Sequence, residues 1–219
     1  MTRPSIRTLL AALAVAAAFA APSGAAAQSA PDPTASVADN GRIIGSDKAP
    51  IWMLVVSDYQ CPFCKDWHAK TWNALKTEYV NTGKVRVAFV HFPLGNHRHA
   101  RPAAIASMCG SAQGKFWQLG DAIFNSQERW KDMTDATATF EALAKTVGLD
   151  MAAYKTCIGS KAIAAMVDAD RIRMSRAGTG STPTFFIGGS RFEGAQPLAE
   201  FRRVIDAELA AAARTARKP

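Results

Sequence analysis

The segment that decides the fold is residues 51–64, IWMLVVSDYQCPFC. It begins with a continuous apolar run that has β-branched and aromatic members, which is typical of a buried central strand. Two cysteines three positions apart, Cys61 and Cys64, follow almost at once. Residues 65–80 continue as an amphipathic helix. Its predicted apolar face is formed by His68, Trp72, Leu75 and Tyr79. The sequence therefore predicts a CxxC motif at the junction of a strand and a helix.

The rest of the chain predicts a mixed fold around this junction. Residues 85–90 predict a second strand, and its short connection to the helix favours a parallel βαβ unit. Residues 96–178 predict a series of helices. The C-terminal part predicts a strand at 184–187, a hairpin turn at Gly188-Gly189, a returning strand at 191–194 and a helix at 198–213.

The N-terminal residues have the pattern of a secretory signal peptide. Arg3 and Arg7 precede an apolar stretch, and a run of alanines ends at Ala27. The apolar stretch is about 13 residues long, shorter than the roughly 20 that a spanning helix needs, which disfavours a membrane anchor. We therefore expect a signal peptide at 1–27 and a mature protein in the periplasm. The expected mature parts are a flexible leader at 28–40, one domain at 41–213 with a helical insertion at about 96–178, and a basic tail at 214–219.

Composition and charge suit an ordinary globular protein. Of the 219 residues, 48% are hydrophobic and 20% are charged, enough for one domain with a sizeable core. The formal net charge is +8. Basic residues alternate with acidic ones along the C-terminal half, which indicates a solvated helical surface rather than a nucleic-acid or membrane interface. No nucleic-acid partner is predicted.

Three segments carry a resemblance to a known family. They are SDYQCPFCK at 57–65, the helical block with HAR at 99–101 and AAIASMCGSAQGKFWQLGDAIF at 103–124, and GTGSTPTFFIGG at 178–189. In this order they resemble the thioredoxin superfamily and, within it, the exported DsbA-like thiol–disulfide oxidoreductases. The resemblance covers roughly residues 41–210. It implies an α/β thioredoxin-like fold with a helical insertion between the βαβ half and the C-terminal ββα half.

The CxxC motif suits thiol–disulfide exchange because the two sulfurs have different surroundings. At the N-terminus of a helix, unpaired N–H groups and the helix dipole favour a Cys61 thiolate. Pro62 fits the first helical turn, where its missing N–H costs nothing. Cys64 lies one turn later and more shielded. We therefore expect Cys61 to attack the substrate and Cys64 to resolve the mixed disulfide, with Phe63 beside them at the substrate-binding surface.

The Thr182-Pro183 pair is the predicted second half of the site. The resemblance implies a cis peptide bond before Pro183, which places backbone groups of Thr182 beside Cys61, where they pair with an extended substrate. Pro62 and Phe63 complete the predicted substrate-binding set. The alternative is an ordinary trans turn.

The other cysteines and the histidines leave alternatives open. Cys109 and Cys157 are expected to form a structural disulfide; they could instead be two buried thiols or a bond that regulates the CxxC pair. The CxxC motif itself could be a structural disulfide, or could bind zinc or copper with His91, His97 and His99. A second CxxC motif is absent from the sequence, so we predict no metal and no other cofactor. His68 is expected to pack or face solvent.

The resemblance also implies partners. The leading hypothesis is an oxidase that passes its disulfide to reduced, newly exported proteins and is reoxidised by a membrane partner that hands electrons to quinone. The second is an isomerase or reductase. Isomerases of this type usually add a dimerisation domain, for which residues 28–50 are too short, and this favours the oxidase. Thr182 weakens that preference, because threonine before the proline also occurs in isomerase-like relatives. A monomer is expected. The third is a periplasmic metal-binding protein. Relatives often carry an acid where Val55 stands, so Asp58 or water is expected to handle the proton of Cys64.

Overall fold

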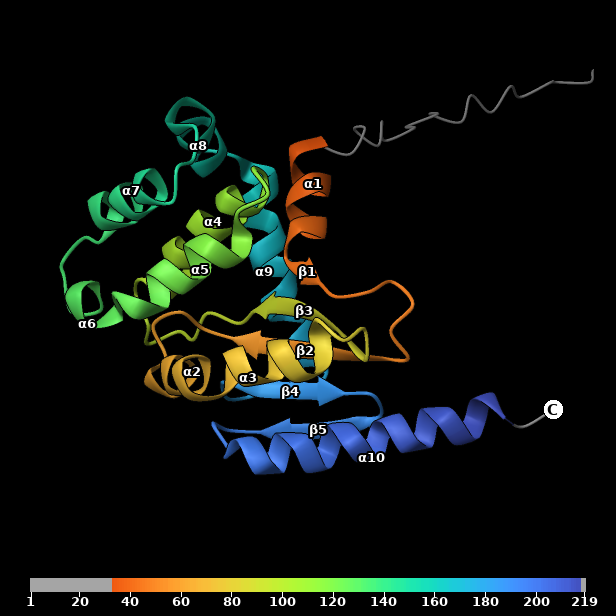
Figure 1. The fold of residues 1–219 in the computed structure, drawn as a ribbon. Coiled ribbons are helices and arrows are strands. Elements are labelled where there is room, and N and C mark those ends of the chain that lie inside the picture. The colour runs from red at the N-terminus through yellow and green to blue at the C-terminus, as the bar shows by residue number, and fades with distance from the viewer. Residues whose placement is uncertain (1–32, 218–219) are drawn as a thin grey trace, which may run out of the picture. The chain divides into compact units, whose positions relative to one another are not determined.

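The computed structural model describes residues 33–217, which lie within one unit, Pro31–Pro219. Five strands form one sheet in the order β1-β3-β2-β4-β5 (Figure 1). The central strand β2 runs parallel to β3 and antiparallel to β4. The strands are β1 (Ile43–Ile44), β2 (Ile51–Ser57), β3 (Val85–His91), β4 (Thr184–Ile187) and β5 (Ser190–Glu193).

The helices divide into three groups along the chain. The first helix, α1 (Pro33–Gly41), precedes the sheet, and α2 (Pro62–Trp67) and α3 (Asn73–Leu75) connect β2 to β3. A run of helices separates the βαβ half from the β4–β5 hairpin and the last helix, α10 (Leu198–Ala216), as predicted. This helical insertion consists of α4 (Ala100–Ser111), α5 (Phe116–Asn125), α6 (Gln127–Trp130), α7 (Thr137–Thr146), α8 (Met151–Ile158) and α9 (Lys161–Arg176).

Alternating side chains of β2 place the two faces of the sheet in different cores. Met53 and Val55 point into the main core, where the helix after β2 and Phe201 of α10 also contribute. Val56 points to the other face and packs in a smaller cluster that includes Met174 of α9. The sheet is thus covered on both faces, which explains the nearly continuous apolar sequence of β2.

The helix that follows β2 contains two π-helical turns, η1 (His68–Trp72) and η2 (Lys76–Val80). The wider turn explains why Trp67 is buried although it lies off the predicted apolar face. Trp67 and Trp72, five positions apart, both point inward with ring centroids 6.0 Å apart. Trp67 packs on Phe185 of β4 with centroids 4.8 Å apart, and Trp72 stacks on Trp117 of α5 at 4.9 Å.

The chain differs from the expected organisation at two places. Residues 33–41 form α1, where a flexible leader was expected over 28–40, and α10 extends to Ala216, into the expected basic tail. Helix α1 packs because Ala38 is fully buried and its carbonyl accepts a hydrogen bond of 2.6 Å from the Ser111 hydroxyl of α4. The predicted signal peptide at 1–27 lies outside the described residues. Within residues 33–217, no helix is both long and apolar enough to cross a membrane.

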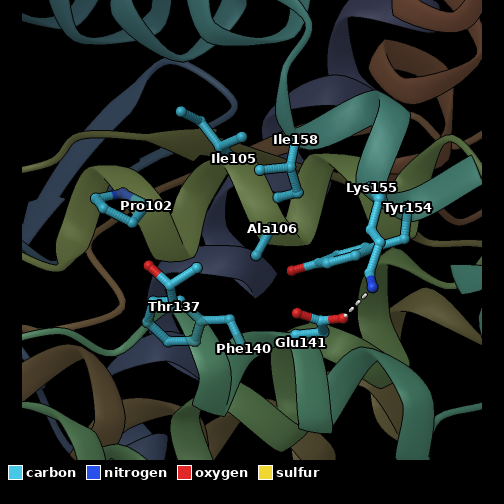
Figure 2. Close-up of a pocket in the computed structure, with 9 residues that line it drawn as sticks. All are labelled: Pro102, Ile105, Ala106, Thr137, Phe140, Glu141, Tyr154, Lys155 and Ile158. Carbon is cyan, nitrogen blue, oxygen red and sulfur yellow. Dashed lines mark ion pairs between the residues drawn. The ribbon is translucent and has the colours of Figure 1, made fainter. Parts of the chain in front are cut away.

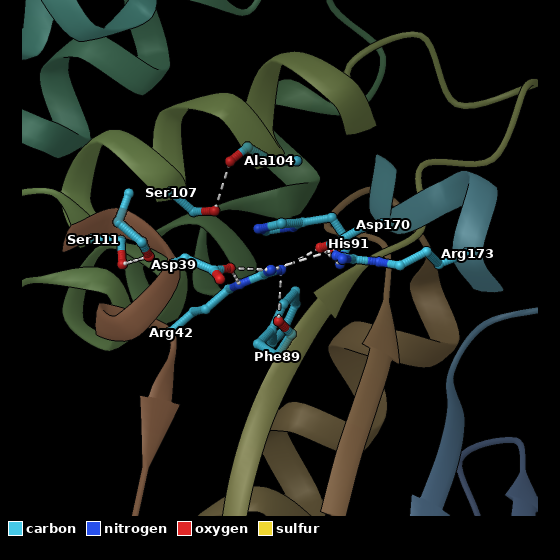
Figure 3. Close-up of polar contacts among 10 residues, drawn as sticks. Asp39, Arg42, Phe89, His91, Ala104, Ser107, Ser111, Asp170 and Arg173 are labelled. Atoms are coloured by element: carbon cyan, nitrogen blue, oxygen red, sulfur yellow. Dashed lines mark hydrogen bonds and ion pairs between the residues drawn. The ribbon is translucent and has the colours of Figure 1, made fainter. Parts of the chain in front are cut away.

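A buried guanidinium holds α1 against the rest of the domain (Figure 3). Arg42, 7% exposed, pairs with Asp39 of α1 and with Asp170 of α9. It also donates a hydrogen bond of 3.2 Å to the carbonyl of Phe89 in β3. Asp170 accepts the backbone N–H of His91 at 3.0 Å. Each buried charge therefore has partners, as a charge in a protein interior requires.

Candidate active site

The CxxC motif lies where the sequence predicts it, between the end of β2 and the start of α2. Cys61 is the N-cap of α2 with extended backbone angles (φ −69°, ψ 124°), and Pro62 follows at the first helical position. The backbone N–H of Cys61 donates to the carbonyl of Asp58 at 3.1 Å, so a tight turn joins strand to helix. The helix N-terminus consequently points at the Cys61 sulfur.

The two thiols have opposite electrostatic environments. Both are free; Cys61 is 3% exposed and Cys64 is 0% exposed. A hydrogen bond from Cys64, with smaller contributions from Thr182 and the backbone N–H groups of the first turn, outweighs burial and lowers the pKa of Cys61 to about 6. Burial, followed by the neighbouring Cys61, raises the pKa of Cys64 well above its ordinary value. At neutral pH this pair holds one thiolate and one thiol.

The Thr182-Pro183 peptide bond is cis and lies against Cys61. In its thiol form the Cys61 sulfur donates a hydrogen bond of 3.4 Å to the carbonyl of Thr182. The sheet explains this approach, because Thr184 of β4 is paired with Val56 of β2, so the residues before β4 lie beside the residues after β2. Phe63 is 64% exposed next to this edge, which gives the site an apolar rim.

The Asp58 side chain stabilises the loop before Cys61. It is 2% exposed, and its carboxylate accepts the backbone N–H groups of Gln60 at 2.7 Å and Leu94 at 2.9 Å. The same carboxylate pairs with Nδ1 of His97 at 2.8 Å. Val55, at the position where relatives often carry an acid, is part of the apolar core. The oxygens of Asp58 therefore organise backbone and histidine around the site.

The sequence analysis did not find Gln127, which joins the helical insertion to the CxxC loop. Gln127 is fully buried in α6, and its Nε2 donates to the carbonyls of Tyr59 at 2.7 Å and Cys61 at 3.1 Å. A single glutamine in a polar stretch carries no signal of such a role. The contact depends on how α6 packs on the loop, 66 residues away in sequence.

The histidines considered as metal ligands do not gather with the cysteines. His91 lies among aromatic rings of the core, and burial lowers its pKa to about 3. His97 pairs with Asp58, and Nε2 of His99 contacts the carbonyl of Met133 at 2.7 Å. His68 stacks on Phe124 of α5, as the expected packing role requires. Among residues 33–217, histidines, cysteines and acids form no group of three that could hold a metal ion.

Cys109 of α4 and Cys157 of α8 form a disulfide bond with an S–S distance of 2.02 Å. It joins two helices of the insertion across a sequence separation of 48 residues. Both cysteines are buried in the main core, so the bond lies inside the insertion. The pair is separate from Cys61 and Cys64, which are both free thiols.

A cavity of about 240 Å³ lies in the helical insertion (Figure 2). Its wall is mostly apolar, and an ion pair of 3.0 Å between Lys155 and Glu141 lies at one side. Helices α4, α7 and α8 provide the lining, which consists of Pro102, Ile105, Ala106, Thr137, Phe140, Glu141, Tyr154, Lys155 and Ile158. None of these residues belongs to the CxxC region, so the cavity and the thiol pair are separate features.

A reactive thiol at a helix N-terminus, a shielded second thiol and a cis-proline beside them define a class, the thiol–disulfide oxidoreductases with a thioredoxin-like sheet. Comparisons with known proteins agree with that class. The family model described as Thioredoxin matches residues 37–207. The probable disulfide bond formation protein D of Bacillus anthracis is 30% identical over 173 residues, which cover 76% of this chain and 77% of that protein.

Solved structures give the same result. The crystal structure of Wolbachia pipientis alpha-DsbA1 superposes with a TM-score of 0.72 at 27% identity, over 80% of this chain and 94% of that one. Oxidised BdbD from Bacillus subtilis gives a TM-score of 0.70 over 78% and 94% of the two chains, and at 22% identity it supports the fold. The chain belongs to the thioredoxin family and, within it, to the DsbA-like protein disulfide oxidoreductases. The predicted fold class is confirmed.

Proposed function

We propose that this protein is an exported oxidase that introduces disulfide bonds into newly exported proteins through the Cys61–Cys64 pair. The single observation that carries the direction is the pKa of Cys61, lowered to about 6. A thiolate stabilised in this way also stabilises the reduced form of the pair. The disulfide form is then the less stable of the two redox states, so the protein tends to donate its disulfide.

The proposed reaction has two exchanges at sulfur. A substrate thiolate attacks Sγ of Cys61 in the disulfide form; the Cys61–Cys64 bond breaks, and Cys64 leaves with the electron pair. A second substrate thiolate then attacks the substrate sulfur of the mixed disulfide, and Cys61 leaves as a thiolate. The substrate has lost two electrons and gained a disulfide, and the enzyme pair has been reduced.

The edge formed by Thr182, Pro183 and Phe63 supplies the proposed substrate surface. An extended chain pairs with backbone groups of Thr182 while its cysteine reaches Cys61, in the manner of an added strand. Pro62 and Phe63 offer apolar contact beside the sulfur. This surface recognises backbone and exposed apolar groups, which suits many different client sequences.

The reduction potential of the Cys61–Cys64 pair tests the direction. Equilibrating the protein with glutathione mixtures should give a value on the oxidising side of about −200 mV, toward the value of about −120 mV for the strongest oxidants among such pairs. A value of about −270 mV would support the reductase or isomerase alternative instead, to which threonine before the proline is also suited. Oxidation of a reduced, unfolded client should then be faster than repair of a scrambled one.

Variants of the two cysteines test their separate roles. Cys61→Ser should abolish disulfide transfer, because the attacked sulfur is gone. Cys64→Ser should accumulate mixed disulfides, because its Cys61 thiolate still attacks client disulfides and no Cys64 thiol is present to release the client; non-reducing gels and mass spectrometry detect them. Full oxidase activity in Cys61→Ser would show that another sulfur carries the reaction.

Export and reoxidation complete the proposal. Residues 1–27 are proposed to be removed at Ala27 during export to the periplasm, which N-terminal sequencing of the mature protein checks. A membrane partner is proposed to reoxidise the reduced pair and pass the electrons to quinone. Membranes of the source cell should therefore oxidise the reduced protein catalytically, and membranes depleted of quinone should not.

A further inference from the structure

Ser57, the last residue of β2, has a buried hydroxyl beneath the CxxC helix. It is 1% exposed, and its Oγ has no hydrogen-bond partner in the part of the chain that the structure describes. It lies two residues after Val55, so both side chains point to the face of the sheet that carries the main core. A buried polar group without a partner is uncommon and calls for a reason.

The buried thiol of Cys64 lies in the same main core, in the helix α2 that begins at Pro62, shortly after this strand ends. Ser57 and the backbone N–H of Asp58 both favour the thiolate form of Cys64, against burial and the nearby Cys61. Cys64 is 0% exposed, so solvent does not reach its sulfur. The two groups are thus the local donors for a negative charge that forms on this buried atom.

The other half of the site has the same arrangement. The Thr182 hydroxyl is also buried and has no partner among residues 33–217, and it favours the thiolate form of Cys61. Each sulfur of the CxxC pair therefore has one buried hydroxyl beside it. A hydroxyl that is free in the thiol state is ready to donate when the sulfur becomes an anion, as preorganised donors are in other catalytic sites.

We propose that the Ser57 hydroxyl, with the backbone N–H of Asp58, binds the sulfur of Cys64 as it departs as a thiolate. The proposal rests on the proposed function of the Cys61–Cys64 pair. When a substrate thiolate attacks Cys61, the Cys61–Cys64 bond breaks and Cys64 takes the electron pair. A stabilised leaving thiolate departs faster. Ser57 is then a catalytic residue at the resolving sulfur, in a chain that has Val55 where relatives often carry an acid.

The role of Ser57 predicts an effect on rate without an effect on equilibrium. At pH 7 the reduced enzyme holds Cys64 as a thiol, because its pKa is raised well above the ordinary value. The Cys64 thiolate is therefore transient. A donor that binds only the thiolate lowers the barrier in both directions and leaves the redox equilibrium unchanged.

Reduction of the oxidised protein by excess dithiothreitol at pH 7 tests the proposal. The disulfide that remains is measured by acid quench, alkylation and mass spectrometry. Ser57→Ala should be reduced about tenfold more slowly than the wild type, and Ser57→Thr, which keeps the hydroxyl, within about twofold of it. The equilibrium with glutathione at pH 7 should stay within about twofold in both variants.

Ser111→Ala is the matched control, because Ser111 is also a fully buried serine but donates its hydrogen bond to Ala38. It should lose stability and keep the wild-type reduction rate. Reduced Ser57→Ala should be at least as stable as the wild type, since its hydroxyl has no partner to lose. Reduction of Ser57→Ala at the wild-type rate would overturn the proposal, as would a redox equilibrium that shifts by the same factor as the rate.

This test does not depend on the direction of client chemistry. Dithiothreitol attacks the disulfide of any CxxC pair, so the Ser57 effect is measurable even in a protein that fails to oxidise clients. If the wild type fails to oxidise clients while Ser57→Ala is reduced about tenfold more slowly by dithiothreitol, the proposed oxidase is refuted and the role of Ser57 is supported. If the wild type oxidises clients while Ser57→Ala is reduced at the wild-type rate, the oxidase is supported and the role of Ser57 is refuted.

Discussion

Cys61 gives the reduced protein a characteristic dependence of stability on pH. Its pKa in the folded state is about 6, below the value of about 8.5 that a free cysteine has. Between these values the unfolded chain binds more protons than the folded one, so stability rises with pH. The contribution of Cys61 is present above about pH 8.5 and is lost as the pH falls through about 6. The raised pKa of Cys64 acts in the opposite sense and becomes effective above about pH 8.5.

Urea unfolding of the reduced and oxidised forms from pH 5 to 8 measures this difference. The stability of the reduced form should rise relative to the oxidised form across this range, because the oxidised form has no thiol to titrate at these positions. Reduced Cys61→Ser should lose the rise. A difference between the two forms that is constant with pH would contradict the lowered pKa of Cys61.

Gln127 is a buried residue through which the insertion holds the loop around Cys61. Gln127→Ala removes two buried hydrogen bonds, to the carbonyls of Tyr59 and Cys61, and should lower the free energy of unfolding by about 2–4 kcal/mol. Gln113→Ala is the matched control, since Gln113 makes two hydrogen bonds to the backbone of Asp150 at the surface. Its cost should stay below about 1 kcal/mol in the same urea experiment. Equal costs would contradict the role of Gln127.

The proposed reacting residues can be named from the sequence, whereas the residues that support them cannot. Cys61 and Cys64 follow from a motif and its position at the end of a strand, which are local features, and the place of the Thr182-Pro183 pair follows from the family resemblance. Ser57, Gln127 and the Asp58–His97 pair act through contacts that only the folded chain creates. Their residue types occur elsewhere in the sequence without such roles, so local pattern does not single them out.

At the scale of elements, the anchoring of α1 is the clearest target. Arg42 and Asp170 are both buried, and removal of Arg42 leaves the Asp170 carboxylate with only the exposed Arg173 and the backbone N–H of His91 as partners. Arg42→Ala should lower the free energy of unfolding by about 3–5 kcal/mol. Arg101 of α4 pairs with Asp168, which lies on α9 as Asp170 does. Arg101→Ala should lower the free energy of unfolding by less than about 1 kcal/mol, because both side chains are about half exposed. Urea unfolding separates the two variants.

The ion pair between Arg42 and Asp170 also explains why the sequence did not predict helix α1. Apolar or alternating runs predict the strands β2, β3 and β4, and Gly188-Gly189 predicts the hairpin. Residues 33–41 carry no comparable apolar face, because α1 buries little more than Ala38. Its place depends on an ion pair between residues 128 positions apart, and no window along the chain contains both partners.

At the scale of the whole molecule, the Cys109–Cys157 disulfide has a structural effect that can be separated from catalysis. Closing a loop across 48 residues restricts the unfolded chain and stabilises the fold by up to about 4 kcal/mol. Cys109→Ala with Cys157→Ala should therefore lower the free energy of unfolding by an amount approaching that value. The reduction potential of Cys61–Cys64 should stay the same, and a shift in that potential would support a regulatory bond instead.

The low exposure of Cys61 has a consequence for the timing of client oxidation. A sulfur that is 3% exposed, beside a protruding Phe63, is accessible to a thiol on an extended and mobile chain. A client cysteine that has already become buried is out of reach. Under the proposed function, the folding of each client therefore competes in rate with its encounter with this enzyme. Small domains fold within microseconds to seconds, so slowly folding clients, and those still emerging from the membrane, are the ones whose cysteines this protein pairs.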